Sequence, residues 1–333
     1  MERITIIGLG LIGGSLGLAL KAARLKNVEI VGHDRDAEVT ARARKRGAVD
    51  QGEWNLISAV RTADMVIIAT PVQAVREIFT QVAQHLPEGC VVTDTASTKA
   101  EVMTWAEELL PEHVSFIGGH PMAGKESTGI DAADATLFQN SMYCLLPSAR
   151  ASQGAIDSCL GLARTAGATP YFVDAHEHDG FAAAISHLPL VMSAALVSTV
   201  ASAPSWREVA RLASSGFRDV SRLASGDEEM SRDICITNRE SLVRWIDRFV
   251  EVMLHYRRLV ADEPERLGQE FRAAREARDR WLAIKAGLVT DEPKVEIPTA
   301  SQAMQDIFLG RGFGRVIKGL EETKRAPRPP EPR

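Results

Sequence analysis

The sequence predicts an α/β domain, built on a doubly wound and mostly parallel sheet, followed by an all-α domain. Three observations support this fold class. Apolar runs that suit buried strands alternate with helical stretches through the first 146 residues, and a glycine-rich turn follows the first run. From residue 176 to about 286, apolar residues repeat with helical periodicity and hardly any strand signal remains. With 333 residues, the chain can form two domains that each bury a core.

The elements of the first domain follow in the order that alternating strands and helices require. The run ITII (4–7) is the first expected strand, and a helix follows from Leu11 to about Arg24. Another helix is expected from Pro71 to about Gln84, directly after the apolar strand DMVIIAT (64–70). The remaining expected elements are strands at 28–34, 91–94, 114–119 and 141–146, a helix around 152–166, and a last strand in TPYFV that closes the domain near residue 174.

The second half of the chain is expected to be helical. Its most apolar stretch, LPLVMSAALVSTVASA (188–203), is too short to span a bilayer and carries Pro189, so we expect a helix buried within the domain. A second helix, at 241–260, has an apolar stripe that core packing explains, made of Leu242, Trp245, Ile246, Phe249 and Val252. The predicted segments are 1–174, 175–286 and a C-terminal extension, 287–333, whose proline-rich end is expected to be disordered.

The glycine-rich turn has G-x-G-x-x-G spacing at Gly8, Gly10 and Gly13, where the first strand ends and a helix begins. The first glycine permits the tight turn, the second lets the backbone approach a pyrophosphate, and the third lets the helix pack closely on the strand. Free N–H groups at the helix start, around Leu11 and Ile12, would face the phosphates with the positive end of the helix dipole behind them. Alone, this string is a weak signal.

The next expected strand, VEIVGHD (28–34), strengthens the signal of the glycine turn because it ends in Asp34. A carboxylate there accepts hydrogen bonds from an adenosine ribose 2′-hydroxyl and repels a 2′-phosphate. Strand, glycine turn, helix, strand and acid together predict a Rossmann-type domain that binds NAD in preference to NADP. Arg35 is the competing signal, since an arginine accommodates the extra phosphate unless it is a solvated surface charge.

Composition and charge argue against several function classes. The net charge of −5 leaves no basic stripe, so no nucleic-acid partner is expected. The first strand begins by residue 3, which leaves no room for a signal peptide, and no membrane partner is expected. Four cysteines without C-x-x-C spacing suit reduced thiols in the cytoplasm. His176 and His178 could be metal ligands, but their spacing on a helix start points them apart; we interpret them as helix-start polar residues and predict no metal.

Chemistry is expected at the carboxyl ends of the strands and at the start of the helical half. Four stretches stand out there: DTASTK (94–99), GGHPMAGKE (118–126), ISHLPLVMS (185–193) and SSGFRDVSRLASGDEEMSRDICITN (214–238). His120 lies between a glycine and a proline on a strand end, which is unusual for a structural imidazole, although a satisfied loop histidine remains possible. On its apolar helix face alone, His187 would more often be a core histidine.

These four stretches, in this order behind the glycine turn, resemble the prephenate and arogenate dehydrogenase family of tyrosine biosynthesis. The likeness runs from residue 3 to about 260, and HPMAG, SHLP and GFRD-x-x-R-x-A followed by DI-x-x-x-N are specific as a set. The resemblance implies a homodimer whose helical domain forms the interface and whose active site lies in the cleft between the domains. The implied reaction is NAD-linked oxidative decarboxylation of a cyclohexadienol that carries a ring carboxylate.

The resemblance also implies roles for residues near the nicotinamide. His120 carries over as the group that hydrogen-bonds to the C4 hydroxyl and polarises it or accepts its proton, a task that suits a neutral imidazole. Ser97 carries over as its partner between the hydroxyl and the nicotinamide. Thr70 and Pro71 would border the nicotinamide.

Other residues carry over as contacts to the substrate acid. Arg222 corresponds to the bidentate clamp on the ring carboxylate, and Arg218 is a second cation for which a surface or capping role is an equal alternative. His187 corresponds to a contact with the substrate side chain. Glu229 aligns with an acid typical of arogenate-preferring relatives, which predicts use of both substrates with a lean to arogenate. Its alternative role is a solvated helix start.

The sequence departs from the family pattern in places. Leu190 replaces a polar residue, and Ser215 and Ser231 stand near the expected substrate or partner subunit, where some relatives have glycine and tryptophan. The extension 287–333 is too short for the regulatory domain that some relatives append, so tyrosine inhibition would act at the active site. Two rival functions remain: a β-hydroxyacid or imine-type dehydrogenase, disfavoured because no lysine occurs between 126 and 284, and a non-catalytic NAD-binding sensor.

Overall fold

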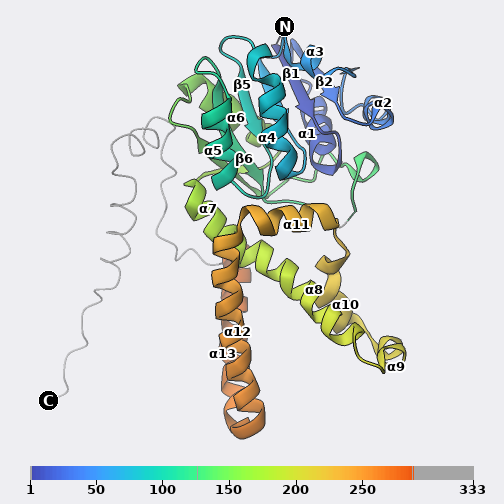
Figure 1. The fold of residues 1–333 in the computed structure, drawn as a ribbon, viewed down its shortest axis with the longest axis vertical. Coiled ribbons are helices and arrows are strands. Elements are labelled where there is room, and N and C mark those ends of the chain that lie inside the picture. Colours follow the sequence, from blue (N-terminus) through green and yellow to red (C-terminus); the bar gives the residue numbers. More distant parts are fainter. Residues whose placement is uncertain (1, 126, 287, 289–333) are drawn as a thin grey trace, which may run out of the picture.

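A computed structural model describes residues 2–125, 127–286 and 288, and Figure 1 shows a sheet domain above a helical part. One sheet of eight strands has the order β3-β2-β1-β4-β5-β6-β7-β8, and every neighbouring pair is parallel except β6 and β7. This confirms the predicted doubly wound, mostly parallel sheet. The strands are β1 (Glu2–Ile7), β2 (Val28–His33), β3 (Gln51–Gly52), β4 (Met65–Ile68), β5 (Val91–Asp94), β6 (Ser115–Pro121), β7 (Met142–Pro147) and β8 (Thr169–Phe172).

Helices cover both faces of this sheet, so its central strands are buried on both sides. All four residues of β4 are buried, as expected of a strand that lies between two helical layers. One core lies against α1 and α6, and a second lies against α4 and α5. The helical elements of this domain are α1 (Leu11–Ala22), α2 (Ala37–Lys45), α3 (Leu56–Val60), α4 (Val72–Val82), η1 (Ala83–His85), α5 (Ala100–Leu109), η2 (Ile130–Ala132) and α6 (Gln153–Thr165).

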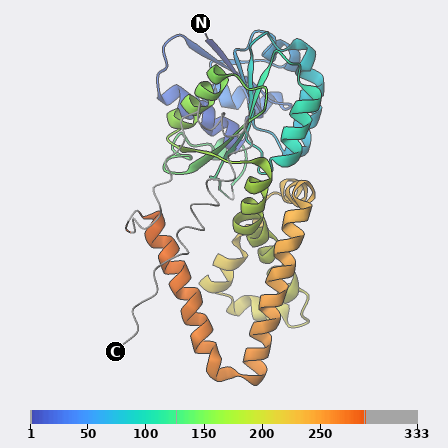
Figure 2. The same cartoon turned by 90° about the vertical axis from the view of Figure 1, so that its left-hand side faces the viewer.

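The rest of the described chain is helical, which confirms the predicted second fold unit. Helix α11 packs against α4 and α7 packs against α5, while α12 and α13 form a hairpin that extends away from the sheet (Figures 1 and 2). Its elements are α7 (Ala175–Ala182), the π-helix η3 (Ala183–His187), α8 (Leu188–Ala201), α9 (Trp206–Leu212), α10 (Ser215–Ser221), η4 (Arg222–Ser225), α11 (Glu228–Thr237), α12 (Arg239–Asp262), η5 (Pro264–Arg266) and α13 (Leu267–Lys285).

The expectation of a buried helix at 188–203 is wrong for the single chain. Ser193 is the only buried residue of α8, and on α12 the predicted core residue Val252 is 43% exposed. The helix is also longer than predicted, because α7, η3 and α8 run continuously from Ala175 to Ala201 over 27 residues; by length and composition alone such a helix suffices to cross a membrane. Within one chain, too few elements pack against α8 to cover its apolar side chains.

The three predicted segment boundaries remain predictions. The sheet ends with β8 and the helical part begins with α7, so the expected boundary after residue 174 falls in the short connection between them. Except for Leu288, the predicted C-terminal extension 287–333 lies outside the described residues.

Candidate active site

The three glycines of the turn meet three different local requirements. Gly8 has a φ of +88°, and a Cβ there would lie 2.5 Å from the carbonyl oxygen of Ala69. A Cβ on Gly13 would overlap the carbonyl oxygen of Gly8, so the close approach of α1 to the turn excludes any larger residue. Around Gly10 no described heavy atom comes within 4 Å of the Cβ position, which leaves this backbone open to a ligand.

The start of α1 has the features of a phosphate site. Gly10 is the N-cap residue and supplies no side chain to bond the first helical N–H groups, and the first turn, which begins with Leu11 and Ile12, contains no acid. Free N–H groups and an uncompensated helix dipole at this position suit a pyrophosphate. The residues present therefore fit a dinucleotide.

Asp34 follows β2 and is hydrogen-bonded to the glycine turn. Its Oδ2 atom accepts a hydrogen bond from the Leu9 backbone N–H at 2.8 Å, and its Oδ1 atom accepts one from Asp36 at 3.0 Å. Arg35 is exposed. Pro71 is the N-cap residue of α4, and the buried Thr70 hydroxyl finds no hydrogen-bond partner among the described residues.

A chain of three buried side chains begins at His120 on β6. His120 Nδ1 lies 2.9 Å from His178 Nε2, and His178 Nδ1 lies 2.8 Å from Asp179 Oδ1. The two Asp179 oxygens also accept the backbone N–H groups of Lys99 at 2.8 Å and Ala100 at 2.9 Å. This chain of hydrogen bonds therefore connects β6 of the sheet domain to α7, and the Asp179 carboxylate at its end also binds the start of α5.

These contacts fix which nitrogen of each imidazole carries a proton. Both Asp179 oxygens act as acceptors, so His178 Nδ1 must donate to Asp179 and His178 Nε2 must accept. His120 Nδ1 then donates to His178, and His120 Nε2 keeps a free lone pair. Burial, reinforced by the nearby Lys99 ammonium, holds the pKa of His120 well below 6.5. At neutral pH this imidazole is uncharged and ready to accept a proton.

Lys99 and Asp94 hold the strand end that carries His120. The Lys99 ammonium forms a buried ion pair with Asp94 and donates to the Gly119 carbonyl oxygen at 2.8 Å. Asp94 Oδ1 accepts the Gly119 N–H at 3.1 Å. Both polar groups of the residue before His120 are thus tied to one buried pair, which restricts where the imidazole can lie.

His187 lies at the end of the π-helix η3, behind the same aspartate. Asn238 Nδ2 is 2.7 Å from the Asp179 carbonyl oxygen and 3.1 Å from His187 Nδ1. The hydroxyls of Thr98 and Thr237 are 2.8 Å apart and join the DTASTK loop to α11. The first and fourth predicted stretches, which contain Thr98 and Asn238, therefore meet at the junction of the two domains.

The predicted arginines lie on the helical side. Ser193 on α8 donates to the Val220 carbonyl oxygen and accepts the Ala224 N–H, both at 3.1 Å. These bonds hold η4, which begins at Arg222, against α8. Arg222 is exposed. Arg218 pairs with the exposed Asp219 at 3.2 Å, which matches its alternative role as a surface cation.

The remaining predicted residues differ in exposure. Ser97 is half-buried between two buried residues of the β5–α5 loop. Ser215 begins α10 and is exposed. Glu229 is exposed in the first turn of α11, whose N-cap Asp227 accepts the Met230 N–H at 2.8 Å; this arrangement matches the solvated helix start.

The interpretation of His178 as a mere helix-start polar residue is wrong. Asp174 caps the start of α7, while His178 and Asp179 are buried one turn later and face β6 and α5. Asp94, Lys99 and Asn238 lie in stretches that the sequence singled out, but none of them was assigned a role. The sequence offered no signal for the contact of His178 with His120, because β8 runs antiparallel to β6 and its carboxyl end lies at the opposite edge of the sheet.

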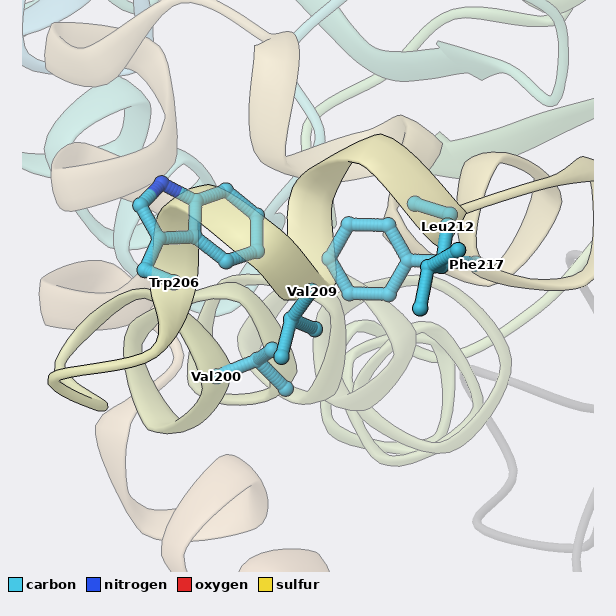
Figure 3. Close-up of a pocket in the computed structure, with 6 residues that line it drawn as sticks. Val200, Trp206, Val209, Leu212 and Phe217 are labelled. Atoms are coloured by element: carbon cyan, nitrogen blue, oxygen red, sulfur yellow. The ribbon is translucent and has the colours of Figure 1, made fainter.

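A separate apolar hollow of about 230 Å³ lies between α8, α9 and α10 (Figure 3). Its lining is Val200, Trp206, Val209, Leu212, Ala213 and Phe217, none of which is charged. A charged ligand would find no charged partner among these residues.

Family models match most of the described chain. The prephenate dehydrogenase nucleotide-binding domain matches residues 16–171, and the prephenate dehydrogenase dimerization domain matches residues 174–273. Prephenate dehydrogenase of Bacillus subtilis is 36% identical over 283 residues, which cover 84% of this chain and 76% of that protein. Cyclohexadienyl dehydrogenase of Zymomonas mobilis is 31% identical over 287 residues, 85% of this chain and 96% of that protein.

Two solved structures show a similarity to the same family. Prephenate dehydrogenase from A. aeolicus, in complex with hydroxyphenyl propionate and NAD⁺, has a TM-score of 0.77 at 27% identity, over 85% of this chain and 98% of that one. Synechocystis arogenate dehydrogenase has a TM-score of 0.70 at 29% identity, over 84% of this chain and all of that one. The similarity extends through the sheet domain, the site at its edge and the helical part, and the chain therefore belongs to the prephenate dehydrogenase family.

Proposed function

We propose that the protein catalyses NAD-dependent oxidative decarboxylation of prephenate to 4-hydroxyphenylpyruvate and of arogenate to tyrosine. The observation that carries the proposal is the buried chain His120–His178–Asp179, which leaves a neutral imidazole with a free Nε2 lone pair. His120 lies near the carboxyl end of β6, at the same edge of the sheet as the glycine turn after β1, where a dinucleotide fits. The names of the relatives in the family support both substrates.

NAD supplies the acceptor for the hydride that leaves C4 of the substrate ring. The chain's own task is to remove the proton of the C4 hydroxyl, and His120 Nε2 is the group that receives it. The resulting positive charge is stabilised through His178 by the Asp179 carboxylate, as in other acid–histidine pairs. Ser97, on the loop after β5, is the proposed partner between hydroxyl and nicotinamide.

Decarboxylation follows because the ring becomes aromatic. The C1–carboxylate bond breaks, its electron pair enters the ring, and the C4 oxygen regains a proton as the phenol forms. Arg222, with its planar guanidinium, is the proposed clamp that orients the ring carboxylate, and Arg218 is the second cation. His187 and Ser215 are the proposed contacts to the rest of the substrate. Gly8, Gly10 and Gly13 with Asp34, Thr70 and Pro71 would hold the cofactor.

The preference between prephenate and arogenate depends on the protein groups near the side chain of the bound acid, where the two substrates differ. An acid near that end favours the ammonium group of arogenate and opposes the doubly anionic prephenate. Glu229 is the candidate, and its exposed position at the start of α11 supports only a modest lean to arogenate. Replacing Glu229 by glutamine should then change the ratio of the two kcat/KM values by only a few-fold.

A homodimer through the helical part is the proposed assembly. The apolar side chains of α9 and α10 that the single chain leaves exposed support it, Leu212 at 85% and Val220 at 59% among them. The description of the second family model as a dimerization domain supports it too. The proposed location is the cytoplasm, with no nucleic-acid or membrane partner.

The experiment that tests the proposal measures NADH formation by absorbance with prephenate and then arogenate, using NAD and NADP in turn. Turnover with at least one acid, faster with NAD, is expected. Binding of NAD without turnover of either acid would favour the non-catalytic sensor instead. Turnover of a β-hydroxyacid alone would point to the other dehydrogenase class.

A further inference from the structure

His187 has one ring nitrogen that the fold does not satisfy. The side chain is 1% exposed, and its Nε2 atom has no hydrogen-bond partner among the described residues. Buried polar atoms are nearly always paired in native proteins, so such an atom calls for an explanation. The other nitrogen, Nδ1, lies 3.1 Å from Asn238 Nδ2.

The orientation of the Asn238 amide follows from its second contact. Its Nδ2 atom is 2.7 Å from the Asp179 backbone carbonyl, which can only accept. The amide nitrogen therefore faces both Asp179 and His187, and each of its two hydrogens has one acceptor. His187 Nδ1 accepts the second hydrogen, so the proton of the neutral ring lies on Nε2.

We propose that Asn238 is a positioning residue that fixes His187 as a hydrogen-bond donor through Nε2, aimed at an acceptor oxygen of a bound ligand. The inference rests on the proposed function, because it names the role of a residue within the same site. Burial holds the pKa of His187 at about 4, so the ring does not become a double donor at neutral pH. The π-helix that ends at His187 is a local irregularity of a kind that often marks functional sites.

The two imidazoles of the site thus have opposite roles at the same ring position. His120 presents a lone pair at Nε2, whereas His187 presents an N–H group there. Asp179 anchors both arrangements, through its carboxylate for His178 and His120 and through its carbonyl for Asn238 and His187. A donor N–H binds a carboxylate or carbonyl oxygen and repels an ammonium group, so His187 selects an acceptor oxygen of the bound ligand.

The acceptor oxygen could belong to the substrate or to the nicotinamide side of the cofactor, and one variant separates the two. In Asn238→Asp the new side chain cannot donate, so His187 Nδ1 takes the proton and Nε2 loses it. If the substrate carries the oxygen, KM for the acid rises about tenfold or more, while KM for NAD and kcat change less. If the cofactor carries it, the NAD constant rises instead. Unchanged KM values for both would overturn the proposal.

The matched control is Asn55→Asp. Asn55 caps α3, where its Oδ1 atom accepts the Ser58 N–H at 2.9 Å, and aspartate caps a helix equally well. This variant should keep both KM values. A second arm compares binding of 3-(4-hydroxyphenyl)propionate and 4-ethylphenol by calorimetry: Asn238→Asp should weaken the carboxylate ligand more, if the side-chain carboxylate is the acceptor.

A direct readout on the free enzyme makes the test independent of turnover and of any failure of the variant to fold. Nitrogen-15 spectra of labelled histidine distinguish the tautomers of an imidazole, and His187→Gln assigns the signal. The wild-type protein should show His187 with the proton on Nε2. A proton on Nδ1 would overturn the proposal even if the enzyme is active. Lack of activity with both acids, with the expected tautomer, would contradict the proposed function instead.

Discussion

Replacing Asp179 by asparagine tests the proton chain at its buried end. The two carboxylate oxygens accept three hydrogen bonds, from His178 Nδ1, Lys99 N and Ala100 N, at 2.8, 2.8 and 2.9 Å. Asparagine has one acceptor oxygen and one NH₂ group. In either orientation of the amide, one backbone N–H faces another donor, and the negative charge behind His178 is lost.

The expected effects on stability and on rate follow from the lost hydrogen-bond acceptor and the lost charge. A buried donor without a partner costs about 1–3 kcal/mol of unfolding free energy. Loss of the charge that stabilises protonated His120, or reversal of the His178 tautomer, removes general-base catalysis, which contributes about 10²–10⁴-fold to rate. We therefore expect kcat to fall by about 10²–10⁴-fold. NAD binding should change little, because in the described part of the chain the Asp179 carboxylate bonds to His178, Lys99 and Ala100 and not to the glycine turn.

The assay is NADH formation across pH together with urea unfolding. The matched control is Asp174→Asn on the same helix, because Asp174 caps the start of α7 with its side chain and asparagine caps equally well. That variant should keep kcat and lose at most a few tenths of a kcal/mol. If Asp179→Asn retains kcat within about threefold, the proton chain is not catalytic and the reasoning fails.

Three further predictions concern pH, the cofactor and assembly. Because burial lowers the pKa of His187 from 6.5 to about 4, the unfolded chain binds the proton first, and stability falls by about 1.3 kcal/mol from about pH 7.5 to 5.5. Urea unfolding of wild type and His187→Gln measures this, and an equal pH slope in both refutes it. Gly10→Ala should keep its melting temperature but bind NAD at least about tenfold more weakly, whereas Gly13→Ala should lose stability; the reverse order would contradict the turn's roles. Leu212→Glu, at a residue 85% exposed, should yield a monomer by light scattering; an unchanged dimer would place the interface elsewhere.

The fold was predictable where one local pattern has one solution. Strand, glycine turn and Asp34 occur within 31 residues, and Gly8 and Gly13 are constrained by close approaches of backbone to backbone. The alternation of strands with helices then determined the sheet. How much of α8 the single chain buries was not predictable in this way. An apolar helix has the same sequence pattern whether its own domain or a second copy of the protein covers it.

The candidate site was only partly predictable, for a related reason. His120 and His187 stand out in short motifs, but the partners that set their protonation come from distant parts of the chain. His178 is 58 positions from His120, and Asn238 is 51 from His187. Local spacing suggested only that His176 and His178 point apart, and it carried no information about which strand end His178 would meet.

The central claim, that His120 is the base beside the bound dinucleotide, is tested most directly by His120→Asn, with turnover measured as NADH formation and NAD affinity measured by calorimetry. The account predicts an NAD dissociation constant within about threefold of wild type and a turnover lower by about 10²-fold or more. Turnover that survives within a factor of a few would contradict it.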